Sequence, residues 1–505
     1  MKITNLITVG LFNFFTKGFC KLLFADAFLS SAVCRSIGRH ILLKRRLSII
    51  GLLIIFSTFM LTSLYAQDSS NSNVAQGLGS GNSGVWINAS NVLEVTSLDM
   101  GRVELQQLNA ARKSYLQSSS SVKTKSATRF ISLKHLEREI IKSNGVPTDE
   151  MKYLAGLTRI KYLFFFPDSK DIVIAGPAEG WYPGAEGMMV GQNTGKPICE
   201  LQDLVVALRA FAPNKEAVDV IGCSIDPTSD GNANLQKYIR GNHLDRSRVN
   251  LFAEGMRRSL GLQTIRVDGI PETTHAARVM IAADYRMKLI GIGLEKIPVG
   301  VNITTFIEKT DLSASQSNKL HRWYFMPEYK SVVATEDKTG LELVGDGVKL
   351  VTEEEVVNSI TGKREITNNS IDRASLEFTR SFTAQYPKIA KKILAYAQLR
   401  NLIDMFVCAA HIQKQDFYGK AEWSMEFFGD ENKFAVQTYQ SPKFVMPAVN
   451  FKIRNGKIGF PIGGVEIEPA AALSNENIKF EKQNQISNIR NKIKIELKPG
   501  QWWWD

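Results

Sequence analysis

The chain has 505 residues, of which 44% are hydrophobic and 22% charged, and a mean hydropathy of −0.11, as in a soluble protein with sizeable cores. Its formal net charge of +12 is a nucleic-acid signature only if the basic residues are spread over the folded part. Residues 1–66 hold eight of the 62 basic residues and one of the 50 acidic ones, which leaves a net charge of +5 for residues 67–505. We therefore expect no nucleic-acid partner.

The N-terminal segment has the design of an export leader. The positive run KRR at 44–46 precedes the apolar run LSIIGLLIIFSTFMLTSLYA at 47–66, and the polar stretch QDSSNSN follows. This order is typical of a secretory signal with Ala66 as its last residue, so we expect a periplasmic or secreted protein. Leu64 is at position −3 of this cleavage site, where a small residue is typical. Residues 47–66 are therefore either removed with the signal or retained as a single membrane anchor.

Cysteine usage fits export without a disulfide framework. Removal of the leader leaves Cys199, Cys223 and Cys408. An odd, small number of cysteines does not build a disulfide scaffold in an oxidising compartment. Two arrangements stay open, one disulfide with a buried thiol or three buried thiols.

The middle third has the most regular hydrophobic pattern. Residues 160–178 predict two strands joined by a short Pro-Asp-Ser-Lys turn, and residues 200–211 predict an amphipathic helix. A strand at 217–225 follows, and Thr273 or Thr274 can cap a later apolar helix. Strands that alternate with helices predict an α/β or α+β core with a mixed sheet.

The last third changes character. Residues 322–355 predict a hairpin meander, and a long helix follows over about 372–413, where Pro387 either makes a kink or starts the second half. The C-terminal ninety residues predict a β-rich region. We therefore expect a leader or anchor (1–66), a flexible linker (67–84), an N-terminal helical extension (85–150), an α/β core (151–300), a β-hairpin region (301–365), a long helical segment (366–415) and a β-rich C-terminal region (416–505).

Four stretches of the middle third carry a resemblance to a known family. In chain order they read LFFFPDSKDIVIAGPAEGWYPG, LQDLVVALRAF, IGCSIDPT and ARVMIAADYRMKLIGIGLE. Together they resemble an uncharacterised family of exported planctomycete proteins, the domain of unknown function numbered 1598. The resemblance covers about 155–300 and, more loosely, the region through QLRNLIDMFVCAAHI. It implies export and one α/β-containing unit, and it implies no activity, ligand or catalytic residue.

The stretch IGCSIDPTSDG carries the first candidate site. Cys223 as a nucleophile needs a base, and His275 with Glu179 or Asp284 supplies an imidazole and a carboxylate for a Cys–His–acid arrangement. The simpler interpretation is a small buried cysteine at a strand end, before a turn that caps the next helix. An acidic site from Glu179, Asp226 and Asp284 is the other enzymatic alternative.

Metal and phosphate motifs are incomplete. The same stretch matches the first positions of an EF-hand calcium loop, but position 12 is Lys237 instead of glutamate, which excludes that site. GQNTGKP at 191–197 has three residues between its glycines and Pro197 after the lysine, so a tight hairpin turn is a better interpretation than a phosphate loop. No His-x-x-x-His or Cys-x-x-Cys spacing occurs, so we expect no metal and no cofactor.

Charged and aromatic residues supply the binding candidates. Asp284 and Arg286 lie in an apolar helix, where they are either buried structural pairs or part of a site. The aromatic candidates are Trp181, Trp502, Trp503 and Trp504. The three terminal tryptophans dock either into the protein's own groove or onto a partner, a glycan or a membrane interface.

The leading hypothesis is an exported, non-catalytic binding or structural protein of the cell envelope, whose partner is an envelope protein or a glycan. The alternative is an exported hydrolase that uses Cys223 with His275, or the three carboxylates. The sequence contains no complete catalytic motif that decides between them.

Overall fold

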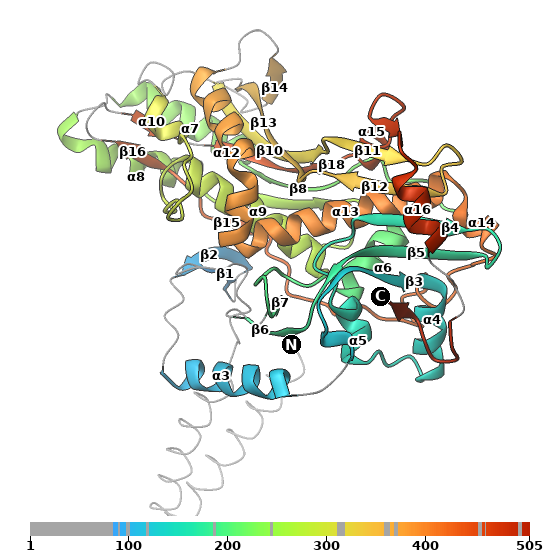
Figure 1. Cartoon of the computed structure of the whole chain (residues 1–505). Coiled ribbons are helices and arrows are strands. Elements are labelled where there is room, and N and C mark those ends of the chain that lie inside the picture. The colour runs from blue at the N-terminus through green and yellow to red at the C-terminus, as the bar shows by residue number, and fades with distance from the viewer. Residues whose placement is uncertain are drawn as a thin grey trace, which may run out of the picture. The chain divides into compact units, whose positions relative to one another are not determined.

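Two mixed β-sheets frame the protein, which a computed structural model describes over most residues from Gly84 onward. The predicted leader (1–66) and residues 67–83 of the predicted linker lie outside the described residues. The described ranges are 84–88, 91–96, 102–117, 121–184, 188–242, 246–310, 319–357, 364–367, 372–452, 457–459, 461–492 and 497–505. They confirm the α+β class, with strands and helices mixed along the chain (Figure 1).

The larger sheet has nine strands among the described residues, and two of its pairings, β15 with β2 and β10 with β18, are parallel. In spatial order its strands are β1 (Gly84–Ile87), β2 (Val92–Thr96), β15 (Phe444–Val445), β9 (Gln263–Asp268), β8 (Ile221–Asp226), β18 (Pro461–Ile467), β10 (Lys319–Glu328), β13 (Gly347–Val357) and β14 (Arg364–Thr367).

The smaller sheet has seven strands in the described part of the chain. In order they are β19 (Ile478–Phe480), β11 (Ser331–Ala334), β12 (Gly340–Val344), β4 (Tyr162–Phe166), β5 (Asp171–Ala178), β3 (Ser126–Ser132) and β20 (Trp503–Trp504). Two short hairpins pair β6 (Trp181–Pro183) with β7 (Met189–Gly191) and β16 (Asn450–Lys452) with β17 (Lys457–Gly459).

The helices of the middle third begin and end close to where the sequence predicts them. Thr274 caps the apolar helix by accepting a hydrogen bond from the Ala277 amide. The helices are α3 (Arg102–Gln117), α4 (Leu133–Lys142), α5 (Asp149–Lys152), α6 (Leu201–Ala210), α7 (Ser229–Gly241), α8 (Val249–Leu260), α9 (His275–Gly291), α10 (Phe306–Lys309), α12 (Arg373–Lys392), α13 (Leu394–Lys414), α14 (Phe417–Lys420), α15 (Pro469–Ala472) and α16 (Gln485–Lys492).

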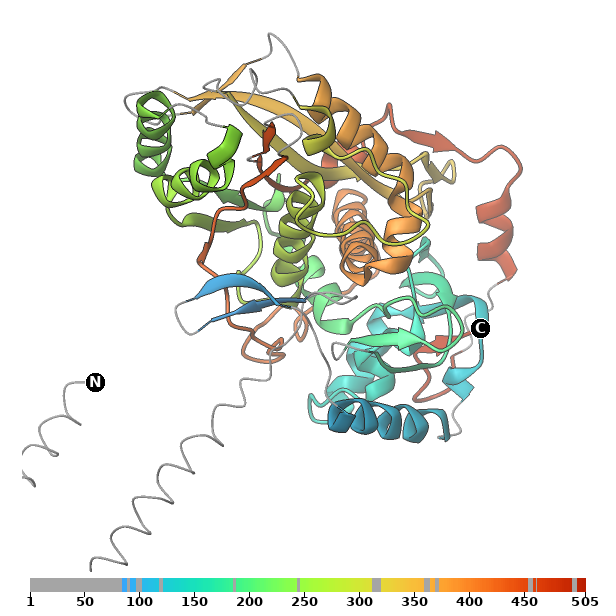
Figure 2. The same cartoon turned by 90° about the vertical axis from the view of Figure 1, so that its left-hand side faces the viewer.

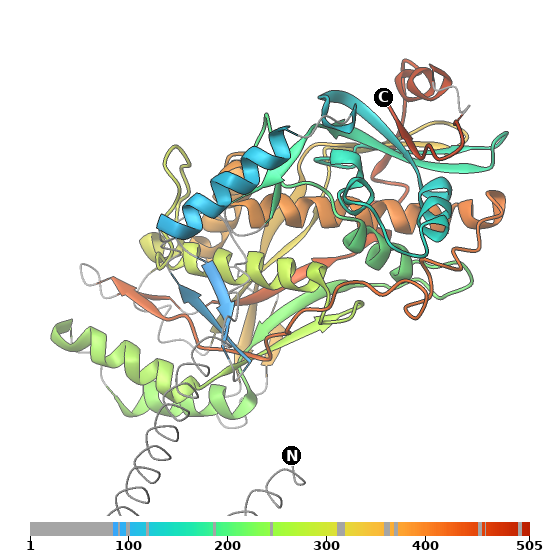
Figure 3. The ribbon, with the colours of Figure 1, turned by 90° about the horizontal axis from the view of Figure 1, so that it is seen from below.

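Helix α13 forms the centre of the core. It lies between the two sheets (Figure 1) and runs beside α9, as the view from below shows (Figure 3). Nearly all of its residues are buried, because apolar side chains cover every face of the helix. Helices α7 and α8 pack on each other away from this centre (Figure 2).

The long helical segment breaks at a different residue from the one predicted. Pro387 lies inside α12, and the chain turns instead at Ile393, whose φ of −119° and ψ of 100° are extended. The two helices meet at 108°. The turn buries Ile393 and lets the Tyr386 hydroxyl donate to the Tyr396 carbonyl at 2.7 Å, so tertiary packing places the break and not the proline.

The predicted hairpin meander is divided between the two sheets. β10 belongs to the larger sheet. The chain then crosses to the smaller sheet, where β11 and β12 form a hairpin, and returns to the larger sheet as β13, which pairs with β10. The β-rich C-terminal region is likewise shared, since β18 enters the larger sheet while β19 and β20 lie at opposite edges of the smaller one.

No single helix in the described ranges has the length and hydropathy to cross a bilayer. The pair α12 and α13 reaches that composition only when both are taken together across their bend.

Candidate functional site

Cys223 is a buried residue of the larger sheet. It lies on β8 opposite Val465 of β18 and Val267 of β9, and its exposed fraction is 3%. Burial raises the pKa of its thiol well above the ordinary value, and Asp284 raises it further. Thiolate chemistry needs the opposite shift, so this environment does not activate Cys223.

The histidine predicted to serve Cys223 has another partner. His275 Nδ1 lies 2.9 Å from Oδ2 of Asp203, a carboxylate that the sequence analysis did not single out. Burial opposes protonation, but Asp203 and Glu200 outweigh it and raise the pKa of His275 to about 9. In the described structure the imidazole is therefore hydrogen-bonded to Asp203 and makes no hydrogen bond to Cys223.

The charges of α9 form buried pairs. Lys288 Nζ donates to Asp284 Oδ2 at 2.8 Å and to the Gly463 carbonyl at 3.1 Å, and Arg286 pairs with Glu295. Burial raises the pKa of Asp284 to about 6, and Lys288 opposes that shift. Asp226 also raises this pKa, so of the three predicted carboxylates these two lie within electrostatic reach of each other.

Glu179, the third carboxylate, holds a turn. Its carboxylate accepts hydrogen bonds from the amides of Asn193 and Thr194 at 3.0 and 3.1 Å, and from the Thr194 hydroxyl. A Cβ on Gly191 would lie 1.9 Å from Oε1 of Glu179, so only glycine leaves room for the carboxylate. GQNTGKP thus forms the tight turn predicted for it, and Lys196 follows in a fixed position.

The predicted aromatic binding residues all contact other residues of the chain, and two of the four are buried. Trp181 is buried beside Tyr153, and Trp502 is buried in the main core. Trp503 lies under the Arg129 guanidinium at 4.5 Å, and β20 adds both terminal strand residues to β3. Trp181 and Trp502 are therefore part of the core, whereas Trp503 and Trp504 stay partly exposed at the edge of the smaller sheet.

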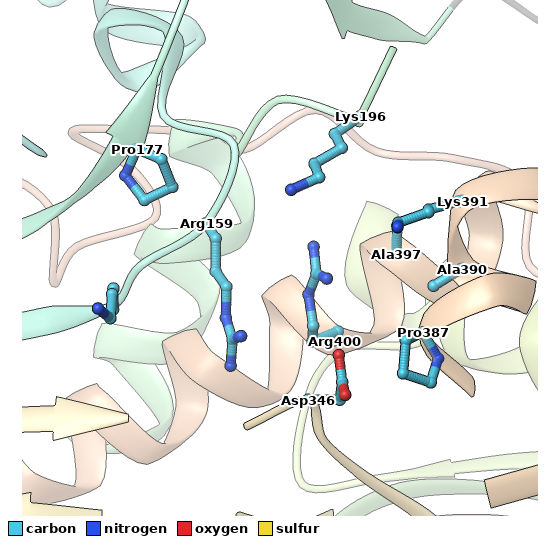
Figure 4. Close-up of a pocket in the computed structure, with 10 residues that line it drawn as sticks. Arg159, Pro177, Lys196, Asp346, Pro387, Ala390, Lys391, Ala397 and Arg400 are labelled. Carbon is cyan, nitrogen blue, oxygen red and sulfur yellow. The ribbon is translucent and has the colours of Figure 1, made fainter. Parts of the chain in front are cut away.

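A cavity rich in cations lies near the bend between α12 and α13. Its volume is about 380 Å³, and we call it the basic cavity. Its charged lining comes from the loop before β4, the turn after β7, the loop between β12 and β13, and both helices (Figure 4). The lining residues are Arg159, Lys161, Pro177, Lys196, Asp346, Pro387, Ala390, Lys391, Ala397 and Arg400.

Two of the five cations of the basic cavity are already neutralised. Arg159 pairs with Asp404, and Lys161 pairs with Glu342 at 3.0 Å. Lys196, Lys391 and Arg400 have no carboxylate within ion-pair distance among the described residues, and Asp346 is the one acidic residue in the lining. The cavity therefore has an excess of two positive charges.

Arg400 is a buried cation whose hydrogen bonds are incomplete. Its exposed fraction is 8%, its Nε has no hydrogen-bond partner in the described part of the chain, and its Nη2 reaches only Asn401 Oδ1 at 3.4 Å. A buried guanidinium with an unused donor is energetically costly unless an acceptor reaches it. Lys196 and Arg400 extend into the same space from opposite walls (Figure 4).

The mutual repulsion of these cations is visible in Lys196. Burial lowers the pKa of its ammonium first, and Arg400, Lys391 and Arg159 lower it further. The α13 N-terminus adds to this positive field, because Ile393 provides no side-chain cap and Ala397 of the first turn lines the basic cavity. The arrangement can hold an anion and disfavours a cation.

The sequence contained one signal for this site. Lys196 belongs to the stretch that resembled a phosphate loop, and it does face an anion-type cavity, although the turn lacks that motif's geometry. Arg159 and Arg400 lie 241 positions apart in apolar surroundings, so no spacing rule unites them. The site exists only after α12 and α13 turn at Ile393.

A protein family described as a protein of unknown function (DUF1598) matches residues 223–303. The match begins at Cys223 in β8 and includes α7, α8 and α9, which confirms part of the resemblance found in the sequence. No curated protein and no solved structure matches the chain. The middle of the chain thus contains a domain of unknown function, and the match assigns it no ligand or reaction.

Proposed function

We propose that this chain is an exported, non-catalytic binding protein whose ligand carries a phosphate, sulfate or carboxylate group held in the basic cavity. The observation that carries the proposal is the buried Arg400 guanidinium, which has an unused donor and faces Lys196 across the cavity. An oxyanion between the two residues would accept hydrogen bonds from the guanidinium and the ammonium and relieve the repulsion between cations.

The rest of the lining supports a small organic anion. Pro177, Pro387, Ala390 and Ala397 give the wall apolar surface beside the cations. A volume of about 380 Å³ falls within the range of small-molecule sites. A partner in the cell envelope, whether a protein or a glycan, would have to present such an anionic group to this cavity.

Titration calorimetry tests the proposal with inorganic phosphate, sulfate and acetate at low ionic strength. We expect saturable 1:1 binding of at least one anion to the unmodified protein. Arg400→Gln should weaken binding about tenfold or more, since hydrogen bonds to charged groups are each worth about 1.5–3 kcal/mol. Lys391→Gln should also weaken it, by a smaller factor because Lys391 is exposed.

Lys388→Gln is the matched control. Lys388 is an exposed lysine of the same helix that does not line the basic cavity, so the same charge is removed one turn away. Its affinity should equal that of the unmodified protein. Failure of all three anions to bind, or equal losses in Lys388→Gln and Lys391→Gln, would reject the proposal.

Export rests on the leader pattern of residues 44–66. Sequencing the N-terminus of protein purified from a cell that exports it should yield Gln67 as the first residue if the leader is cleaved. Recovery of an intact chain from the membrane fraction would instead support an anchor at residues 47–66. An intact chain in the cytosolic fraction would contradict both.

A further inference from the structure

A second polar cluster lies where two helices begin. Glu200 immediately precedes α6, Asp203 lies in its first turn, and His275 is the first residue of α9. One ligand-type atom from each residue lies within 4.8 Å of the other two. We call these three residues the acid–histidine cluster; none of them lines the basic cavity.

The cluster is held from outside by further hydrogen bonds. Gln202 donates to Glu200 Oε2 at 2.5 Å and to the Tyr439 hydroxyl at 3.0 Å, which fixes the Glu200 carboxylate. Thr274 caps α9 and so fixes the start of the helix at His275. Such outer hydrogen bonds orient metal ligands in known metalloproteins.

A cavity of about 230 Å³ opens beside the cluster. Glu200, Gln202 and Tyr153 line it together with the segment 434–437. Asp203 is buried at 6% exposure and does not line this cavity, whereas Glu200 does. An ion held by the cluster would therefore be reached from this cavity and would keep a coordination position open toward it.

The composition of the cluster selects a class of ion. Two carboxylates side by side repel each other, and a cation between them relieves that repulsion. Arg278 lies over the Tyr439 ring at 4.7 Å, and Lys152 lines the neighbouring cavity. One imidazole nitrogen with two carboxylate oxygens suits a transition metal, whereas Ca²⁺ takes six to eight oxygen ligands.

We propose that Glu200, Asp203 and His275 bind one divalent transition-metal ion, of the Zn²⁺ or Mn²⁺ type, with an open position that faces the neighbouring cavity. Binding of the ion releases the proton between His275 Nδ1 and Asp203 to solvent, and both side chains then bind the ion in place of that contact. Three protein ligands with an open position are the pattern of sites where a metal binds a further ligand. Because His275 lies 72 positions after Asp203, no sequence spacing announces the site.

Calorimetry of chelator-treated, tag-free full-length protein with ZnCl₂ and MnCl₂ tests the proposal. We expect one ion per chain, and a loss of affinity of at least tenfold in Asp203→Asn and in His275→Gln. Co²⁺ in place of Zn²⁺ should give a visible absorption spectrum that His275→Gln changes. Asp230→Asn, which removes an exposed carboxylate from the first turn of α7, is the matched control and should bind normally.

Glu200→Gln separates a loss of metal binding from a loss of folding, since Glu200 precedes α6 and lines the cavity, so its replacement should leave the fold intact. It should weaken Zn²⁺ binding while the urea unfolding midpoint stays unchanged. Binding of neither ion, or binding that survives both Glu200→Gln and His275→Gln, would overturn the proposal. A preference for CaCl₂ over ZnCl₂ would also overturn it, because it would remove imidazole from the coordination.

Discussion

Arg159 and Asp404 form a two-point ion pair in the wall of the basic cavity, with Nε–Oδ2 at 2.7 Å and Nη2–Oδ1 at 3.2 Å. Asp404 is fully buried in α13 and also accepts from the Tyr329 hydroxyl at 2.9 Å. The pair joins the loop before β4 to the central helix. Arg159 is thus committed to the fold, while Arg400 and Lys196 are available to a ligand.

Asp404→Asn should destabilise the protein by about 3 kcal/mol, because removal of one partner leaves Arg159 partly buried without a counter-charge. Urea unfolding at neutral pH measures the loss. Asp346→Asn, which removes a carboxylate with no ion pair in the described structure, should leave the midpoint nearly unchanged. Equal effects of the two variants would contradict a special role for the Arg159 pair.

Asp346→Asn should also tighten anion binding by a few-fold. Asp346 is the one carboxylate in the lining of the basic cavity, so it repels any anion held there. Calorimetry with whichever probe anion binds the unmodified protein measures the change. A weaker affinity would mean that the anion lies elsewhere or that Asp346 positions Arg159.

Acid should destabilise the fold through His411. Burial lowers the pKa of His411 to about 4, although its Nε2 lies 3.4 Å from the Lys338 carbonyl. An unfolded histidine takes up a proton near pH 6.5, so the free energy of unfolding falls as the pH drops from about 6.5 to about 4, by up to about 3 kcal/mol. In His411→Gln the stability should change less over this window, which urea titrations at several pH values would detect. A slope equal to that of the unmodified protein would contradict this assignment.

The three described cysteines should resist thiol reagents in the folded protein. Cys199, Cys223 and Cys408 are buried free thiols, and burial raises the pKa of each. Iodoacetamide at neutral pH should label them slowly in the native state and fully in urea. Rapid native labelling of Cys223 alone would instead favour the cysteine-hydrolase alternative.

The buried pair on α9 should behave asymmetrically on mutation. Lys288→Met leaves the Asp284 carboxylate uncompensated and should cost about 3–5 kcal/mol of unfolding free energy. The double variant Asp284→Asn, Lys288→Met should recover most of that loss, because Asp284 Oδ1 has no hydrogen-bond partner among the described residues even in the unmodified protein. Additive losses would show that each side chain is needed for a separate reason.

Local sequence patterns predicted much of the secondary structure. The features that they did not predict depend on packing between residues far apart in the sequence. The helix over 200–211 and the turn at 191–197 follow from spacing and from glycine positions, so both appear where expected. The break at Ile393 does not, because it depends on Tyr386 meeting Tyr396 within the folded core. The basic cavity and the acid–histidine cluster both combine residues distant in sequence, which single-chain patterns do not connect.

The position of β8 limits how this protein can be divided. Its two neighbours in the sheet are β9, some forty residues later, and β18, which lies more than two hundred residues further along the chain. A fragment made only of residues 223–303 would carry β8 with one bare hydrogen-bonding edge, and α9 with a hydrophobic face that α13 no longer covers. Such a fragment should therefore aggregate. The whole chain should fold slowly, because β8 can pair with β18 only after the C-terminal part of the chain has been synthesised.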